Sequence, residues 1–275
     1  MKKRTLLIVV VVALGTLLAA CLPPAPAPPP PPPPPLALPT VAKGFDACAA
    51  PSITTMSKWR TSSVFTRVGV YIGGANKGCA QPNLTSGWVS VVAAQGWGLL
   101  PLWVGPQAPC TTLGNATKLS SNPSVANAQG QTEANAAANA ADALGFGWLT
   151  PIYYDMEAYP RGGTCSSAIQ NFTNGWIAGL NVRGYLAGMY TSLCSGIQDQ
   201  AAGVSAGFAP LNGIWIAAWN NTPNIFGFSA PCALSNVLWF NHQRAHQYIG
   251  GHNELHGGVS INIDTNAVDG PLARF

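Results

Sequence analysis

The sequence predicts an α/β protein built as a (β/α)₈ barrel (a TIM barrel), and three observations support this prediction. Short apolar strands alternate with helical segments over about 230 residues, which is typical of parallel βαβ units. About eight such strands can be counted, the number that closes this kind of barrel. Carboxylates stand at the ends of several strands, where barrels of this class carry their functional groups. The last two helical connections are expected to be short or missing.

The chain opens with a segment typical of an export signal. Met-Lys-Lys-Arg precedes an apolar run over 6–20, which predicts a signal peptide over 1–20. Leu18-Ala-Ala-Cys21 matches the lipobox of bacterial lipoproteins and makes Cys21 the candidate lipidation site. The alternative is an ordinary signal peptide with a coincidental cysteine. The segment lacks an Arg-Arg pair, so a twin-arginine signal is not supported, and the apolar run is too short to favour a retained transmembrane helix.

A proline-rich segment follows the predicted cleavage site. Residues 23–35 are nearly all proline, a composition that adopts an extended polyproline II rod. We therefore assign 21–43 to a lipidated cysteine with a proline-rich linker, and 44–275 to one barrel domain. Because such a tether lifts a domain off a membrane, we expect an exported protein of the cell envelope, either lipid-anchored at the cell membrane or secreted. Its membrane contact is expected to be through the lipid alone.

Charge and cysteine content narrow the function classes. Removal of 1–20 leaves ten basic and nine acidic residues, so the apparent basicity belongs to the signal peptide. The chain has no basic stripe, and we expect no nucleic-acid partner. Six cysteines remain beside Cys21, and an even number in an exported domain predicts three disulfide bonds with fifteen ways of pairing. They are Cys48, Cys79, Cys110, Cys165, Cys194 and Cys232.

The strands are predicted from short apolar runs that are bounded by turn residues. Proline at the first residue and the run Ile-Tyr-Tyr make the strand that begins at Pro151 the clearest of them. The predicted strands lie at 44–48, 67–74, 98–105, 151–159, 185–191 and 213–220, within 237–248, and at 259–264.

The helices are predicted from apolar periodicity and from start and stop signals. Ser52 opens the first helix, and Gly96 and Gly145 close the second and third. An alanine-rich composition supports the third helix, which follows a polar loop at 115–123. The predicted helices lie at 52–62, 84–95, 125–144 and 166–181, with a short one at 197–202.

Two carboxylates stand one residue apart at the end of the strand that begins at Pro151. Side chains of a strand alternate between faces, so Asp155 and Glu157 are expected to point the same way. Unpaired buried charge costs several kcal/mol, which makes such a pair informative. Paired carboxylates are what glycoside hydrolysis requires, because one protonates the leaving oxygen while the other serves as its partner. The alternative is a strand end that carries a cap and a salt bridge.

We assign Glu157, nearer the expected mouth, as general acid and Asp155 as its carboxylate partner, which either raises the pKa of Glu157 or stabilises the positive sugar. Asp46 and Asp264 complete the catalytic set from the first and eighth strands, which neighbour each other in a closed barrel. For each of them the alternative is a structural hydrogen bond. Sugar faces stack on aromatic rings, so the candidate substrate-binding residues are Gln247 and the aromatics Tyr71, Trp103, Tyr190, Trp219 and Tyr248. Tyr154 faces away from Asp155 and is expected to pack outward.

Four histidines cluster near the end of the chain in two pairs at i, i+4: His242, His246, His252 and His256. That spacing can bind a metal on a helix, but Gly250-Gly251 interrupts any helix here, and HExxH and CxxC are both absent. We therefore expect no metal site and no other cofactor. A polar loop, with His246 or Gln247 touching substrate, is the favoured interpretation.

Several motifs occur together in order: Gly44-Phe-Asp46, Tyr71-Ile-Gly-Gly74, Tyr153-Tyr-Asp-Met-Glu157, Asn241-His-Gln243, His246-Gln-Tyr248, Gly250-Gly-His-Asn253 and Ile261-Asn-Ile-Asp264. Through them, residues 41–275 resemble a bacterial glycoside-hydrolase-like family long described as a domain of unknown function, whose exported members are barrel proteins of the cell envelope. That family is similar to the family 25 glycoside hydrolases, lysozymes that cleave N-acetylmuramic acid from N-acetylglucosamine. The resemblance implies the barrel fold and matches the lysozymes' carboxylates to Asp46, Asp155, Glu157 and Asp264, with Glu157 as the acid.

The leading interpretation is a tethered glycosidase whose substrate is a polysaccharide, peptidoglycan or a related envelope glycan. If the sugar is N-acetylated, its own acetamido group can serve as nucleophile, positioned by Asp155. Two alternatives stay open: a non-catalytic module that binds envelope glycan, and a hydrolase of another polysaccharide such as an arabinogalactan-like polymer. Free carboxylates with room for a sugar favour catalysis, whereas salt bridges from them to Arg161 or Arg244 favour binding alone.

Overall fold

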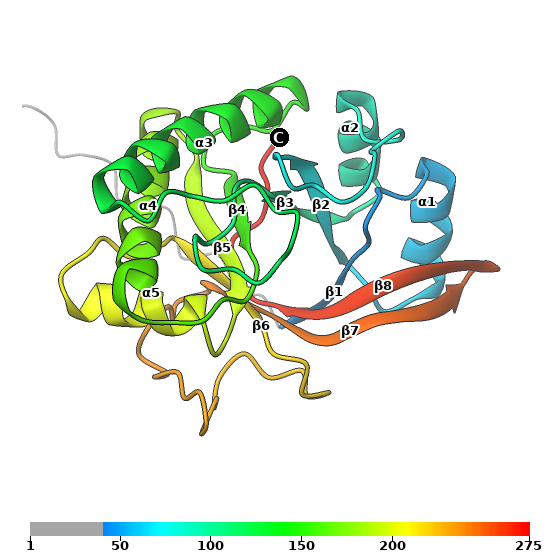
Figure 1. Cartoon of the computed structure of the whole chain (residues 1–275). Coiled ribbons are helices and arrows are strands. Elements are labelled where there is room, and N and C mark those ends of the chain that lie inside the picture. Colours follow the sequence, from blue (N-terminus) through cyan, green and yellow to red (C-terminus); the bar gives the residue numbers. More distant parts are fainter. Residues whose placement is uncertain (1–40) are drawn as a thin grey trace, which may run out of the picture. The chain divides into compact units, whose positions relative to one another are not determined.

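The computed structural model describes residues 41–275, which form a closed barrel of eight strands flanked by helices (Figure 1). The predicted signal peptide, Cys21 and nearly all of the proline-rich linker lie outside the described residues. The barrel begins slightly before the expected boundary at 44, because its first strand opens at Ala42. The strands are β1 (Ala42–Asp46), β2 (Arg67–Gly73), β3 (Gly98–Trp103), β4 (Pro151–Met156), β5 (Leu186–Ser192), β6 (Gly213–Ala217), β7 (Arg244–His256) and β8 (Val259–Val268).

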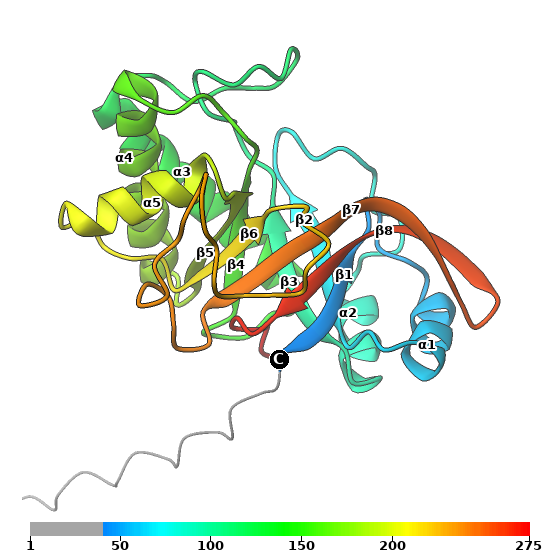
Figure 2. The same cartoon turned by 90° about the horizontal axis from the view of Figure 1, so that it is seen from below.

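A helix follows each of the first five strands within the described residues. In Figures 1 and 2, α1 and α2 cover one side of the barrel, and α3, α4 and α5 cover the other. Ser52 caps the first helix as predicted, since its hydroxyl accepts from the backbone N–H of Thr55. None of these helices is long and apolar enough to cross a membrane. The helices are α1 (Ile53–Ser62), α2 (Ser86–Ala94), α3 (Pro123–Ala143), α4 (Gly163–Val182) and α5 (Gly196–Ser205).

The strands lie around the barrel in sequence order, which confirms the predicted fold class. The expected shortage of late helices is also confirmed, because β6 leads to β7 through a loop and β7 turns directly into β8. The direction of β8 differs from a regular (β/α)₈ barrel, since β8 is antiparallel to both β7 and β1. The reason is the two-residue turn Gly257-Gly258, whose φ angles of 56° and 74° suit a hairpin, whereas a parallel return needs a dozen or more residues.

The predicted end of the eighth strand at Asp264 was therefore wrong. β8 continues to Val268, and Asp264 lies in its middle, directly opposite Asp46 of β1. The outer halves of β7 and β8 extend beyond the barrel as a ribbon that lies beside α1 (Figures 1 and 2). There the indole N–H of Trp59 donates to the carbonyl oxygen of Val259 at 3.0 Å. Asp264 reaches the mouth because of this antiparallel pairing and not because its strand ends there.

The barrel interior is filled by large side chains below the mouth. Trp215 lies in its centre and makes edge-to-face contacts with Tyr153 and Tyr190, each with ring centroids 5.8 Å apart. Gly69 of β2 permits this packing, because a Cβ atom there would lie 2.7 Å from the Trp215 ring and 2.8 Å from the Cβ of Asp46. Since the interior is packed, polar groups have room only at the carboxyl ends of the strands.

Candidate active site

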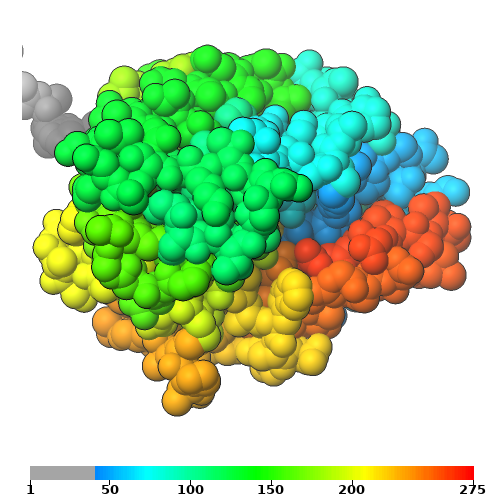
Figure 3. Space-filling model, viewed as in Figure 1, coloured from blue at the N-terminus to red at the C-terminus, as the bar shows by residue number. Residues whose placement is uncertain are grey.

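The four predicted carboxylates line one cavity of about 300 Å³ at the mouth of the barrel: Asp46, Asp155, Glu157 and Asp264. Figure 3 shows this face of the molecule, where the surface is hollowed between the green segment that follows β3 and the orange and red ribbon of β7 and β8. Asp155 and Glu157 face the same cavity, as strand alternation predicts. Glu157 lies one residue beyond the end of β4.

Asp46 and Asp264 are held together by shared hydrogen bonds. Asp46 is 2% exposed and accepts from the hydroxyl of Tyr71 at 3.0 Å and from the amide of Asn266 at 2.7 Å. The side-chain amide of Gln247 donates to Oδ2 of Asp46 and to Oδ2 of Asp264, at 3.2 Å each. Like charges placed opposite each other on neighbouring strands repel. The shared donor offsets part of that repulsion.

Asp155 is the least satisfied member of the set. Its side chain is 4% exposed, and its Oδ1 atom is buried without a hydrogen-bond partner. Burial raises the pKa of Asp155 well above its ordinary value, and the charges of Glu157 and Asp46 raise it further. A buried polar atom without a partner is costly, and this cost falls on a residue that lines the cavity.

The other three carboxyl groups also have raised pKa values. Partial burial raises the pKa of Glu157, and the charge of Asp46 adds to it. Burial raises the pKa of Asp46 although its three amide and hydroxyl donors lower it. Burial, followed by the charge of Asp46, raises the pKa of Asp264 to about 7. All four pKa values are shifted upward, which is the direction that lets a carboxyl group keep its proton for general acid catalysis.

Within residues 41–275, none of these four carboxylates forms an ion pair with a lysine, arginine or histidine, although the charge of His252 lowers the pKa of Asp264. Arg161 forms its ion pair with Asp199, with Nε and Oδ1 2.7 Å apart. The guanidinium of Arg244 donates to the backbone carbonyl oxygens of Ile225, Ser235 and Leu238. The carboxylates are thus not locked by either arginine, and this is the arrangement that favours catalysis over binding alone.

Gln107, in the segment after β3, is a site residue that the sequence reasoning missed. It is 1% exposed, and its amide nitrogen donates to the backbone carbonyl of Asp155 at 2.9 Å. Its side-chain oxygen accepts from the backbone N–H of Glu157 at 2.8 Å. One side chain therefore clamps the strand end that carries both carboxylates. Its one signal in the sequence is its place just beyond the carboxyl end of a predicted strand.

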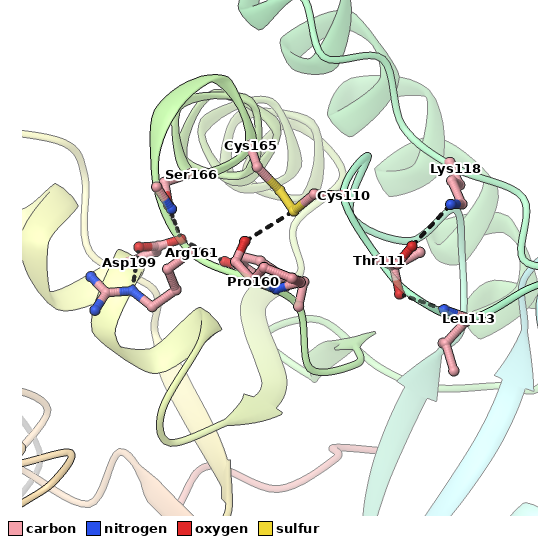
Figure 4. The surroundings of a disulfide bond; sticks show 11 residues. Cys110, Thr111, Leu113, Lys118, Pro160, Arg161, Cys165, Ser166 and Asp199 are labelled. Atoms are coloured by element: carbon pink, nitrogen blue, oxygen red, sulfur yellow. Dashed lines mark hydrogen bonds and ion pairs between the residues drawn. A yellow bond between two sulfur atoms is a disulfide. The ribbon is translucent and has the colours of Figure 1, made fainter.

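The segment that follows Glu157 is anchored to α5 and to the segment after β3 (Figure 4). Asp199 accepts from Arg161 at 2.7 Å and from the hydroxyl of Ser166 at 2.6 Å. The hydroxyl of Tyr159 donates to the same carboxylate at 2.9 Å. The disulfide between Cys110 and Cys165 joins the start of α4 to the segment after β3. These contacts fix the position of the segment that follows Glu157, the candidate acid.

Three disulfides are present, as predicted, and they share one pattern. Each joins the segments that follow two neighbouring strands, β1 with β2, β3 with β4, and β5 with β6. All three therefore lie at the carboxyl ends of the strands, around the mouth. The pairs are Cys48–Cys79, Cys110–Cys165 and Cys194–Cys232.

Four of the six predicted substrate-binding residues lie at the mouth. Tyr71 lines the first cavity. Tyr190 and Trp219 line a second cavity of about 400 Å³, which Glu157 also borders. The Tyr190 hydroxyl and the Trp219 indole N–H each donate to the side-chain oxygen of Gln247 at 2.8 Å. Since both ends of the Gln247 amide are occupied, this residue positions its neighbours.

The structure contradicts the prediction for Trp103 and Tyr248. The indole N–H of Trp103 donates to Glu133 of α3 at 2.7 Å, between the barrel and that helix. Tyr248 packs with Ile225 and Ala267, on the opposite face of β7 from Gln247. Both residues occupy the alternate strand positions that face outward. The outward packing predicted for Tyr154 is confirmed, because its ring contacts Phe172 and Trp176 of α4.

The histidines lie outside this cavity. The two ring nitrogens of His246 lie beside the backbone carbonyls of Ala218 and Asn224, on the outer face of β7, so the suggested substrate contact of His246 is not supported. His242 pairs with Asp269. His252 and His256 both pair with Glu254 on the projecting ribbon. Among the described residues, no group of three or more His, Cys, Asp or Glu side chains is placed so that it could hold a metal ion.

Solved structures share this fold at low sequence identity. An uncharacterized protein of B. stearothermophilus is 18% identical, with a TM-score of 0.56, 82% of this chain covered and 95% of that chain. The Tat-secreted protein Rv2525c of Mycobacterium tuberculosis, solved with L-tartrate, is 15% identical, with a TM-score of 0.56. The match covers 83% of this chain and 96% of that chain. The spore cortex lytic enzyme SleM of Clostridium perfringens is 14% identical, with a TM-score of 0.55. The match covers 83% of this chain and 67% of that chain.

No curated protein matches the chain. A family model does match, over residues 57–268. This segment includes all strands from β2 to β8, three of the four carboxylates and Gln107. Asp46 lies before the matched segment, but it is the direct strand partner of Asp264 within it. The chain therefore belongs to the family described as the Rv2525c-like, glycoside hydrolase-like domain.

Proposed function

We propose that this protein is a glycoside hydrolase of the cell envelope that cleaves peptidoglycan. The observation that carries the proposal is the cavity in which four carboxyl groups with raised pKa values converge without a basic partner. Hydrolysis of a glycosidic bond needs one carboxyl group that holds a proton near neutral pH and a second one close to it. The name of SleM, a spore cortex lytic enzyme, supports a wall glycan as the substrate.

Glu157 is the general acid in this proposal. It lies at the accessible edge of the cavity, and burial together with the charge of Asp46 raises its pKa, which favours the protonated form that a leaving oxygen needs. Gln107 fixes its backbone through the 2.8 Å hydrogen bond to its N–H. The same carboxylate then takes a proton from the water that completes hydrolysis, as microscopic reversibility requires.

Asp155 is the partner that orients the reacting sugar. Its carboxyl group lines the cavity and can accept the N–H of an acetamido group on that sugar. The acetamido oxygen is then directed at the anomeric carbon and displaces the leaving oxygen as Glu157 protonates it. Positive charge that develops on the ring and on the acetamido group favours the charged form of Asp155. A second protein nucleophile is not needed on this route.

Release of reducing ends from purified peptidoglycan tests the proposal. The exported chain is compared with Glu157→Gln and with Glu133→Gln, a matched control whose carboxylate faces Trp103 outside the cavity. We expect release by the wild type and by the control, and a loss of about 10²–10⁴-fold in Glu157→Gln. If neither wild type nor Glu157→Gln releases sugar and both sediment with peptidoglycan, the protein is a wall-binding module. If only another polysaccharide is cleaved, peptidoglycan is the wrong substrate.

We also propose that the protein is exported and anchored through Cys21. Three disulfides support an oxidising compartment. Cys21→Ser should move the protein from the detergent phase to the aqueous phase in a Triton X-114 partition of whole cells. A wild-type protein that is already in the aqueous phase would contradict the anchor and leave a secreted protein.

A further inference from the structure

Three hollows meet at Glu157. The first holds the carboxylates and has a volume of about 300 Å³. The second, of about 400 Å³, lies toward β5 and β6. The third, of about 380 Å³, lies against the segment that follows β3. Its lining includes Asn76, Val104, Gln107, Leu113, Asn115 and Glu157.

The first and second hollows together provide a binding path for the sugar chain. The first provides the carboxylates, and the second provides apolar walls and Trp219, which is 66% exposed and free to stack on a sugar face. A chain of sugars that passes from one to the other crosses Glu157, where the bond is to be cleaved. The third hollow shares Asn76 and Val104 with the first and opens beside that path. A glycan chain that follows this path leaves the third hollow unfilled.

The wall of the third hollow is built before any ligand binds. The side-chain amide of Asn76 donates to the carbonyls of Gly105 at 2.8 Å and Thr117 at 3.0 Å, and its oxygen accepts from the N–H of Thr117 at 2.9 Å. The backbone N–H of Gln107 donates to Thr117 at 2.8 Å. With the disulfide at Cys110, these bonds brace the loop from both ends.

The chemistry of this wall suits a peptide. Apart from Glu157 it carries no charged side chain, which disfavours a phosphate or a uronic acid in this position. Leu113 is 43% exposed over the hollow and offers an apolar contact. Asn115 is exposed beside it and offers an amide donor and acceptor. Small apolar side chains and amide groups together are what a short peptide presents.

We propose that the third hollow binds the stem peptide of the sugar next to the scissile bond. In peptidoglycan such a peptide branches from alternate sugars, so a chain lying across Glu157 directs one peptide sideways at the point where the third hollow opens. The protein is therefore selective for peptide-bearing glycan over bare glycan of the same sugars. This inference rests on the proposed hydrolysis of peptidoglycan at Glu157.

The test compares two substrates, peptidoglycan and the same glycan strands after an amidase has removed their peptides. Asn115→Trp fills the third hollow from an exposed position, and Asn135→Trp on an exposed position of α3 is the matched control. We expect the wild type to prefer the peptide-bearing substrate, and Asn115→Trp to lose about tenfold in kcat/KM on it alone. The control should behave as the wild type on both substrates.

Equal cleavage of the two substrates by the wild type would overturn the inference while leaving the proposed function intact. An equal loss by Asn115→Trp on both substrates would also overturn it, because the residue would then act on the glycan path. If neither substrate is cleaved, the proposed function fails, and the affinities of the two polymers decide the inference separately. Asn115→Trp must then weaken binding of the peptide-bearing polymer only.

Discussion

Replacement of Gln107 by alanine should destabilise the protein through two orphaned backbone groups. The carbonyl of Asp155 loses its donor at 2.9 Å, and the N–H of Glu157 loses its acceptor at 2.8 Å. The carbonyl of Gly105 keeps its hydrogen bond from Asn76 at 2.8 Å, so it adds nothing to the cost. Each orphaned group costs about 1–3 kcal/mol. Because water can reach the exposed Glu157, we expect a loss of about 2–4 kcal/mol.

Urea unfolding of the oxidised protein, followed by tryptophan fluorescence, measures this loss. Gln131→Ala on an exposed position of α3 is the control and should stay within about 0.5 kcal/mol of the wild type. Gln107→Glu keeps the acceptor for Glu157 but removes the donor to Asp155 and buries a carboxyl group beside that carbonyl, so it should destabilise the protein at least as much as Gln107→Ala. A Gln107→Ala protein within about 1 kcal/mol of the wild type would refute the clamp.

Three further predictions concern charge, the disulfides and the aromatics. The raised pKa of Asp264, about 7, means that the folded protein holds a proton there that the unfolded chain releases. The free energy of unfolding should therefore fall as pH rises from about 4 to about 7, and less so in Asp264→Asn; an identical pH slope in urea titrations of both proteins would contradict this. The Cys110→Ser/Cys165→Ser double variant opens a loop of sequence separation 55 and should lose about 4 kcal/mol in the same assay, whereas a loss below about 1 kcal/mol would count against the loop-entropy argument. Trp219→Ala should weaken sedimentation with peptidoglycan about tenfold while Trp103→Phe leaves it unchanged, and the reverse result would place the sugar-binding face elsewhere.

Local patterns in the sequence determined the architecture and the centre of the site. Alternation of strands and helices predicts the barrel, because each βαβ unit is a local solution to burying one strand and one helix. The spacing of Asp155 and Glu157 predicts their common direction, because side chains alternate along any strand. The number of cysteines predicts three disulfides without naming the partners, since pairing depends on which loops become neighbours.

The tertiary structure decided which residues surround that centre. Strands of a barrel are buried on both faces, so apolar character does not reveal that Trp103 and Tyr248 point outward while Tyr71 and Tyr190 point inward. The reversal of β8 depends on a two-glycine turn, and it places Asp264 opposite Asp46.

Gln107 acquires its role because a loop from β3 folds over the end of β4, 48 residues further along the chain. Contacts of that kind follow from the path of the whole chain. A pattern confined to neighbouring residues therefore identifies Asp155 and Glu157, whereas the groups that hold them in place are visible only in the folded protein.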